Sequence, residues 1–373
     1  MGWRVDDELQ QMLRDSARHY LGDNGGPAHF RKVRASASGF DAAAWRQMGE
    51  LGWTGVLLPE AAGGSDLGLG AALTLAEELG RTISPEPYVA AAVIAATVLA
   101  ASEAEAAAAL SGDLASGARS VTLAWQEQRG TVGVPQFATR VSGGRLNGIK
   151  RHVPAWHPET GLLVAAVEGA ETIVAAVDPA AAGVTVHPAR LTDGSLGAEI
   201  ELADVALAER AVILRGAAAD AALELAVARG TVALGAQLEG LASALWQMTV
   251  DYMKQRSQFG SHLSEFQALR HRMIDLYAEI ELAGASWRRA AAALADGQTF
   301  GVALHAAKAR CSQVVQDVGR WSIQYHGAFG FTDEADVGLH VHAGLRWSTW
   351  LGNPVTHRRE ALACHRRERA RNG

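Results

Sequence analysis

The residues best suited to chemistry lie in two short segments of the C-terminal half of the chain. Arg256 and Gln267 belong to the first segment, and Gln324, Gly327 and Gly330 belong to the second. An arginine guanidinium is a planar fork of donors that can bind phosphate in bidentate fashion, and glutamine amides can hydrogen-bond phosphate. Glycines let backbone N–H groups approach an anion closely. These residue types suit a phosphate-binding site, but on the residues alone the favoured interpretation is a solvated helix-end charge and a plain glycine C-cap.

The elements that must position these residues change in type along the chain. Residues 1–117 have helical patterns, with a turn-rich break at 57–64. Residues 118–208 contain short β-branched runs separated by Gly-Gly, Asn-Gly and Asp-Pro pairs, which is typical of strands joined by turns. We therefore predict an N-terminal α-helical domain over 1–117 and a small antiparallel β-domain over 118–208.

Residues 209–373 are predicted to form long helices packed as a C-terminal bundle. Apolar residues there recur at alternating steps of three and four, the spacing with which a helix buries one stripe. The repeating series are Leu234, Leu238, Leu241, Leu245, Met248 and Tyr252; Phe266, Leu269, Met273, Leu276, Ile280 and Ala283; and Leu304, Ala307, Cys311, Val314 and Val318. We expect these residues to form the core of an antiparallel bundle.

Composition argues against several classes of protein. The chain has 34 Lys and Arg against 40 Asp and Glu, a net charge of −6, which disfavours a general nucleic-acid or anionic-membrane binder. Two cysteines are too few for a disulfide framework, and the uncharged stretch 87–102 is too short to span a membrane. His340 and His342 lack a third ligand at suitable spacing, so no metal site is expected. The acidic start predicts no secretion signal and hence a cytoplasmic protein.

Three motifs occur in an order and spacing that are typical of one enzyme family. They are Leu-Leu-Pro-Glu at 57–60, Arg-x-x-Phe-Gly at 256–260, and Gln-x-His-Gly-x-x-Gly-Phe-Thr at 324–332. On these motifs the sequence resembles the acyl-CoA dehydrogenases over about residues 6–365. The resemblance implies a mainly α fold with a central small β-domain and a C-terminal four-helix bundle.

The resemblance also implies an activity and a set of partners. Members of the family are FAD-dependent oxidoreductases that oxidise the Cα–Cβ bond of an acyl-CoA thioester. A carboxylate removes the α-proton while the β-hydrogen leaves as hydride to the flavin. The implied substrate is therefore an acyl-CoA, and the implied electron acceptor is an electron-transferring flavoprotein. Homo- or hetero-oligomers, commonly tetramers, bind the FAD between subunits.

The resemblance assigns the two ends of FAD to different residues of this chain. The diphosphate of a neighbouring subunit's FAD is expected at Arg256, Phe259, Gln267, Gln324, Gly327 and Gly330. The flavin ring of this subunit is expected at Trp125 and Gln126, through backbone N–H groups. The usual ring-stacking Trp and hydrogen-bonding Thr are replaced by His152 and Pro154, and a proline donates no hydrogen bond.

The family's catalytic glutamate is absent from both of its usual positions. Leu351 occupies the position that follows the 324–332 motif, and Gly230 occupies the position on the first bundle helix. Losing a positioned general base typically costs about 10²–10⁴-fold in rate. Arg229 and Gly352 adjoin these positions and are expected at the substrate. The base itself stays unknown, and the remaining candidate carboxylates are Glu60, Glu127, Glu224, Glu239, Asp333 and Glu334.

Three interpretations follow from this pattern. The favoured one is an acyl-CoA dehydrogenase-type subunit that works with a non-identical partner, as shorter bacterial members do on bulky acyl-CoAs that include steroid side chains. In such pairs one subunit keeps the base while the other contributes part of the flavin site. The second is a self-sufficient flavoenzyme with a non-standard base or altered chemistry. The third is a non-catalytic acyl-CoA-binding or scaffold subunit.

Overall fold

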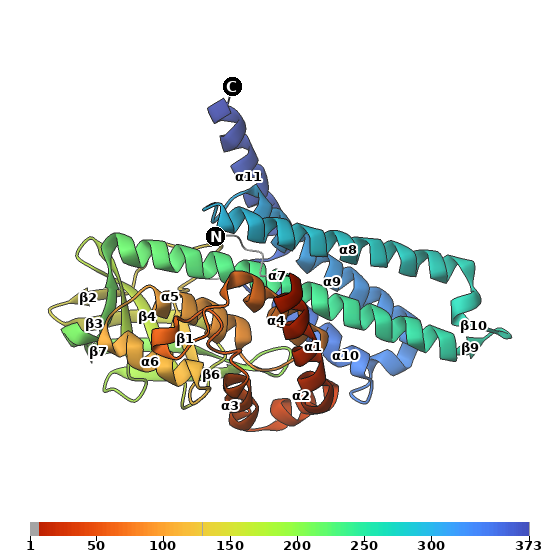
Figure 1. Cartoon of the computed structure of the whole chain (residues 1–373), viewed down its shortest axis with the longest axis horizontal. Helices are drawn as coiled ribbons and strands as arrows, with labels where there is room; N and C mark the ends of the chain where they lie inside the picture. Colours follow the sequence, from red (N-terminus) through yellow and green to blue (C-terminus); the bar gives the residue numbers. More distant parts are fainter. Residues whose placement is uncertain (1–6, 129, 373) are drawn as a thin grey trace.

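Helices make up most of the N-terminal part of the chain. The computed structural model describes residues 7–128 and 130–372. Its first helices lie below the long bundle in Figure 1. They are α1 (Asp7–Asn24), α2 (Gly26–Ala35), α3 (Ala42–Glu50), α4 (Gly68–Arg81), the π-helical segment η2 (Val89–Ala95) with its continuation α5 (Ala96–Ala100), and α6 (Glu105–Ala115).

A mixed β-sheet follows and occupies the left of Figure 1. Its strands lie in the order β6-β7-β3-β2-β4-β5-β8, with β1 beside β4. They are β1 (Val121–Ala124), β2 (Arg140–Ser142), β3 (Arg145–Pro154), β4 (Gly161–Glu168), β5 (Glu171–Val177), β6 (Val184–Arg190), β7 (Leu196–Ala206) and β8 (Val212–Arg215). The last of these strands lies beyond residue 208, where the sequence predicted the β-domain to end.

The expectation of a purely antiparallel sheet was wrong at two of the pairings. Both β1 and β2 run parallel to β4, whereas the remaining ladders are antiparallel. The physical reason is the connection between strands. A parallel pair needs a crossover rather than a tight turn, and local turn signals describe only hairpins.

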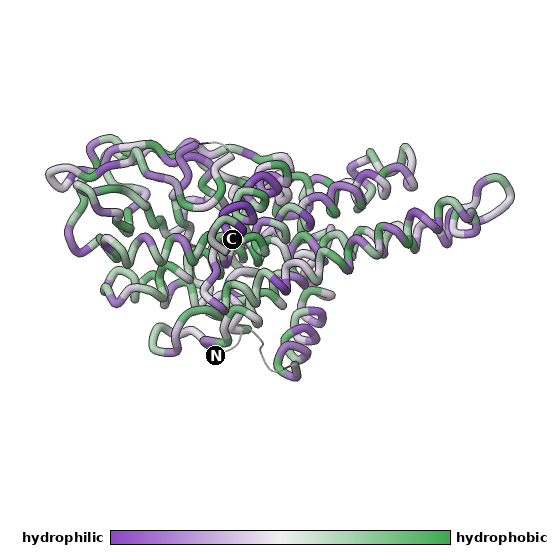
Figure 2. Tube along the Cα trace, turned by 90° about the horizontal axis from the view of Figure 1, so that it is seen from above, coloured by the Kyte–Doolittle hydropathy of each residue, from purple (hydrophilic) through white to green (hydrophobic). Residues whose placement is uncertain are grey.

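The C-terminal part is a helical bundle built around α7 (Gly216–Gln255), which has 40 residues. The other helices are α8 (Gln267–Ala295), α9 (Val302–His326), α10 (Asp336–Thr349) and α11 (Pro354–Asn372). A short hairpin, β9 (Ser257–Gln258) and β10 (Ser261–His262), joins α7 to α8. The predicted α9 series, from Leu304 to Val318, is buried, and this confirms the bundle core. Figure 2 shows that hydrophobic and hydrophilic residues alternate along the projecting helices.

Close backbone contact fixes the N-terminal helices to the bundle. A Cβ atom added at Gly80 of α4 would lie 2.0 Å from the carbonyl oxygen of Gln237 on α7. One added at Gly240 of α7 would lie 2.0 Å from the carbonyl oxygen of Glu77 on α4. Because glycine has no Cβ, the two helices can cross with their backbones nearly touching.

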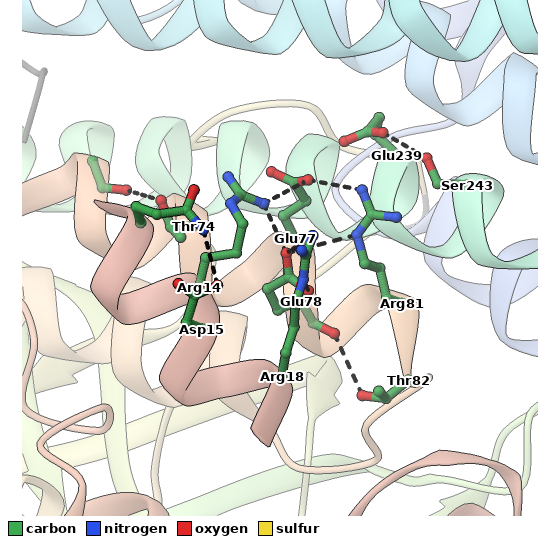
Figure 3. A network of polar contacts seen from close by, with 12 residues as sticks. Arg14, Asp15, Arg18, Thr74, Glu77, Glu78, Arg81, Thr82, Glu239 and Ser243 are labelled. Atoms are coloured by element: carbon green, nitrogen blue, oxygen red, sulfur yellow. Dashed lines mark hydrogen bonds and ion pairs between the residues drawn. The ribbon is translucent and has the colours of Figure 1, made fainter. Parts of the chain in front are cut away.

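Charged side chains surround this crossing (Figure 3). Arg14 of α1 and Arg81 of α4 each donate to Glu77 at 3.0 Å, and they hold the pKa of that buried carboxyl below its usual range against the effect of burial. Glu239 of α7 accepts from Ser243 at 2.8 Å. Burial, and then the neighbouring Glu77, raise the pKa of Glu239. Hydrogen bonds therefore join α1 to α4 at Glu77 and Glu78, whereas Glu239 bonds within α7 and affects Glu77 and Arg81 through its charge.

Gly240→Ala is expected to loosen the crossing of α4 and α7. The added methyl group would overlap backbone that has no room to move, so we expect a loss of about 2–3 kcal/mol in the free energy of unfolding. Chemical denaturation measures this change. Gly22→Ala in α1 is the matched control, because no atom lies within 4 Å of the new Cβ. Equal stability of the two variants would contradict the close contact.

Glu239→Gln is expected to change how stability depends on pH. The pKa of Glu239 is higher in the folded chain than its ordinary value of 4.5. As the pH rises above 4.5, Glu239 of the unfolded chain releases a proton that Glu239 of the folded chain retains. The contribution of Glu239 to the free energy of unfolding therefore falls. Urea unfolding should show that the free energy of unfolding falls more between about pH 5 and about pH 8 in the wild type than in the variant. Parallel profiles would contradict the raised pKa.

Candidate active site

A pocket of about 560 Å³ lies where the β-sheet faces the loop that follows α10. This volume is in the range of small-molecule sites. We call it the ring-side pocket. Its lining includes Gln126, His152, Pro154, Glu199, Leu351 and Gly352. The structure thus brings Gln126 together with His152 and Pro154, which replace the usual ring contacts, and with the loop in which Leu351 occupies a usual position of the base. These residues lie far apart in the sequence.

The two usual base positions lie side by side. A Cβ atom added at Gly230 would be 3.7 Å from Cδ1 of Leu351, and Leu351 is 4% exposed. The same Cβ would be 2.4 Å from Cγ1 of Ile94 on η2. Ile94 therefore fills the space that a side chain at position 230 would need. Both positions at which the family places a carboxylate meet here, and both are apolar.

A buried lysine forms hydrogen bonds with the backbone of the Leu351 loop. The Lys308 ammonium donates to the carbonyl oxygens of Ser348 and Gly352, at 3.0 and 2.9 Å. Burial lowers the pKa of Lys308 to about 7. Leu351 itself has a φ of +58°, a conformation that costs energy in a residue other than glycine. The lysine therefore helps to fix a strained loop at the pocket wall.

A pair of histidines supports the same loop. Nε2 of His357 lies 2.8 Å from the carbonyl oxygen of Leu351. Burial lowers the pKa of His357 to about 3, so the ring is neutral at physiological pH. Because a carbonyl only accepts, the proton of His357 must be on Nε2. Its Nδ1 can then accept from Nδ1 of His305, which lies 3.0 Å away.

The β3 strand is irregular where it lines the pocket. Its register with β7 shifts between Lys150 and Val153, and His152 within this bulge has a φ of +54°. The backbone N–H of Arg151 donates to the carbonyl oxygen of Gln126 at 2.7 Å. Bulges commonly re-aim side chains beside active sites. Here the bulge carries His152, and Pro154 follows it in register with Gly197 of β7.

One carboxylate, Glu199 of β7, lines the ring-side pocket among the residues that the structure describes. Its Oε2 lies 2.5 Å from Nη1 of Arg151. Glu199 is not among the candidates predicted from the sequence. Its place at the pocket depends on the pairing of β7 with β3 and β6, in which Glu199 lies opposite His187. No motif marks such a position, so no local signal identified it.

Several carboxylates proposed from the sequence are occupied elsewhere. Glu127 accepts from the backbone N–H groups of Ala138 and Thr139 and from Lys150, at 2.6, 3.0 and 2.6 Å. Glu224 is hydrogen-bonded to Thr299. The six candidates Glu60, Glu127, Glu224, Glu239, Asp333 and Glu334 are all absent from the lining of the ring-side pocket. Within the described chain, their geometry gives none of them access to a substrate in that pocket.

The residues expected at the diphosphate lie at the far end of the bundle. Arg256 follows α7 and Phe259, 96% exposed, lies on the hairpin at the extreme right of Figure 1. Gln267 begins α8, and Gln324 and Gly327 end or follow α9; all three are exposed. Gly330, in contrast, is buried in the turn after α9.

A contact between two aromatic rings joins the ends of α7 and α9 at the far end of the bundle. Tyr252, near the end of α7, stacks on His326, near the end of α9, with ring centroids 4.2 Å apart. The Arg256 guanidinium is exposed and has no ion-pair or hydrogen-bond partner in the described part of the chain. An exposed arginine without a partner is suited to binding a phosphate group from another molecule.

The residues expected at the flavin ring, Trp125 and Gln126, differ in their access to the pocket. Trp125 is buried and lies outside the pocket lining, whereas Gln126 is part of it. Arg229 is half-buried, and its Nη1 lies 3.4 Å from Oγ1 of Thr97. Burial lowers the pKa of Arg229. Arg229 directly precedes Gly230, so a cation adjoins the position where the substrate was expected.

Over residues 7–128 and 130–372, no group of three or more His, Cys, Asp or Glu side chains could hold a metal ion. In the same part of the chain, no helix is both long and apolar enough to cross a membrane.

Comparisons with known proteins agree with this architecture. Residues 7–118 match the acyl-CoA dehydrogenase N-terminal domain, and residues 215–356 match the acyl-CoA dehydrogenase C-terminal domain. Acyl-CoA dehydrogenase IpdE2 of Mycobacterium tuberculosis is 29% identical over 337 residues, which cover 89% of this chain and 90% of that protein. Acyl-CoA dehydrogenase FadE27 of the same organism is 28% identical, over 87% of this chain and 88% of that one.

Solved structures give the same result. A variant of the Tcur3481-Tcur3483 steroid ACAD has a TM-score of 0.87 and 29% identity, over 97% of this chain and 99% of that chain. The ChsE4-ChsE5 complex of Mycobacterium tuberculosis has a TM-score of 0.85 at 22% identity, over 96% and 97%, and this likeness shows the fold alone. Both family models match, the fold is mainly α with a central sheet, and Gly230 meets Leu351. The chain therefore belongs to the acyl-CoA dehydrogenase family of flavoprotein oxidoreductases.

Proposed function

We propose that this chain is one subunit of a FAD-dependent acyl-CoA dehydrogenase in which each flavin lies between two chains. The observation that carries the proposal is a separation along α7. Gly230 and Arg256 are 26 residues apart, which at 1.5 Å per residue is about 39 Å. No arginine side chain spans that distance. The ring-side pocket of one chain therefore needs the far bundle end of another to complete a flavin site.

The residues of the ring-side pocket fit a flavin ring. The pocket is large enough for a planar ring system, and Gln126 offers polar groups at its wall. Bound FAD would supply the hydride acceptor. This chain would exclude water with the apolar Leu351 and Ile94 and would hold the Leu351 loop through Lys308. Arg256 and the exposed glutamines Gln267 and Gln324 would bind the diphosphate of the partner's FAD.

The partner is proposed to be a non-identical chain that supplies the general base. Leu351 and Gly230 cannot accept a proton, and Glu199 is engaged by Arg151. Relatives whose names contain two components, such as ChsE4-ChsE5, support pairing, and the steroid ACAD supports a bulky acyl group. We further propose a cytoplasmic location and an electron-transferring flavoprotein as the acceptor of the electrons.

A specific observation favours one alternative. Because Glu199 lines the ring-side pocket, a self-sufficient enzyme could use it as an unusual base. It would first have to leave Arg151, whose positive charge favours the ionised carboxylate and makes it a weaker proton acceptor. We therefore rank this alternative below the paired enzyme.

Arg256→Ala is expected to reduce the FAD content of the assembled enzyme about tenfold or more. The variant removes a charge-assisted contact to phosphate without touching the packed core, since Arg256 is exposed. Flavin absorbance per mole of purified complex measures the change. Arg270→Ala on α8 is the matched control, because Arg270 is also exposed. Unchanged FAD content in Arg256→Ala would contradict a role in binding the diphosphate.

Glu199→Gln is expected to leave acyl-CoA oxidation within about threefold of the wild type, since the partner supplies the base. If Glu199 were the base, its loss should instead lower kcat by about 10²–10⁴-fold. Glu201→Gln, two residues along β7, is the matched control, because Glu201 also lies near a basic side chain, His187. A large loss confined to Glu199→Gln would replace the paired enzyme by the self-sufficient one.

A further inference from the structure

A second, smaller chamber of about 50 Å³ adjoins the ring-side pocket. Pro154, Arg346 and Trp350 line both spaces, so the two spaces are neighbours. The volume is enough for a few small polar atoms rather than for a second ligand. Unlike the apolar meeting point of Gly230 and Leu351, this chamber is lined by several polar side chains. They include Glu86, Tyr88, Asp193 and Gln237.

Two hydrogen-bond donors of this chamber are buried without a partner. Tyr88 is 1% exposed, and its hydroxyl group contacts no acceptor in the described part of the chain. Nε1 of Trp350 is likewise buried and unpaired among those residues. Burial raises the pKa of Tyr88, so the hydroxyl keeps its proton. Leaving such groups unpaired is costly, and this makes the chamber a site that a ligand group can complete.

The two carboxylates of the chamber already have partners. The Glu86 carboxylate is hydrogen-bonded to Ser84, and it lies 2.5 Å from Nε2 of His29. Asp193 forms an ion pair with Arg346, with 3.6 Å between Oδ2 and Nε. The two buried groups that lack a partner, the Tyr88 hydroxyl and the Trp350 indole N–H, can both donate a hydrogen bond. Two free donors without a free charge select a neutral oxygen acceptor, such as a carbonyl or hydroxyl oxygen.

The chamber lies at a defined distance from the expected reaction centre. On α7, Gly230 marks that centre and Gln237 lines the chamber. Seven residues separate them, which is about 10.5 Å along the helix. On η2, Ile94 packs against Gly230, whereas Val89 and Ala90 line the chamber. The same two helices therefore run from the reaction centre to the chamber.

We propose that this chamber recognises a ketone or hydroxyl oxygen on the acyl group, about 10 Å from the bond that is oxidised, through hydrogen bonds from Tyr88 and Trp350. The inference rests on the proposed acyl-CoA dehydrogenase function and adds the chemical class of the substrate. Tyr88 and Trp350 are thereby specificity-determining residues. They discriminate against plain acyl chains because an unoxygenated chain leaves both donors unpaired.

The test compares two thioesters that differ in one oxygen atom. Decanoyl-CoA and 9-oxodecanoyl-CoA are titrated calorimetrically into the full chain, purified with the flavin and partner that it carries. The oxo compound is expected to bind about tenfold more tightly to the wild type. Tyr88→Phe should remove most of this preference and leave the affinity for decanoyl-CoA unchanged. The variant should also melt no lower than the wild type, because it loses an unpaired buried hydroxyl.

The outcomes separate this inference from the function on which it rests. Equal affinity of the wild type for both thioesters would overturn the chamber's role while leaving an acyl-CoA-binding protein. A preference that survived in both Tyr88→Phe and Trp350→Phe would overturn the assignment of these donors. Binding of neither thioester would overturn the proposed function as well. Tyr277→Phe on α8 is the matched control, since its ring is 47% exposed and far from the chamber lining.

Discussion

The length of one helix constrains the whole molecule. α7 carries Gly230 beside Leu351, Gln237 at the polar chamber and Gly240 at the crossing with α4, and it ends beside Arg256. A straight helix cannot bring its two ends together, so the ring-side pocket and the exposed Arg256 stay apart within one chain. In the proposed enzyme these two half-sites become adjacent only between chains.

The loop at Leu351 is held independently of the side chain that it presents. Lys308 and His357 contact carbonyl groups of the loop, and Leu351 adopts a positive φ. Such buried polar contacts are costly to leave incomplete, so they stabilise the loop whichever side chain stands at position 351. A leucine at this position leaves the pocket in place but offers no proton acceptor. In the proposed function, a chain with the complete fold would in this way depend on another chain for chemistry.

Polar groups and apolar groups divide the space beside α7. At Gly230 and Leu351 the surroundings are aliphatic, which suits the exclusion of water from a hydride transfer. Two turns further along, Tyr88 and Trp350 present donors without acceptors. The boundary between these regions is set by side chains from three separate parts of the chain. Substrate selection would therefore depend on how the sheet, η2 and the α10 loop pack together, and not on any one motif.

Periodicity and motifs determined much of this protein from the sequence alone. The α9 series from Leu304 to Val318 predicted a buried stripe correctly, because helix burial repeats locally every three or four residues. The resemblance to the family, counted from its motifs, assigns Leu351 and Gly230 to the usual positions of the base. Their contact, the parallel pairing of β1 and β2 with β4, the place of Glu199 at the pocket, and the unpaired donors of Tyr88 and Trp350 emerged only in the tertiary structure. Local patterns report which face of an element is apolar, whereas register, burial and hydrogen-bond partners depend on residues that are distant in the sequence and meet only when the chain folds.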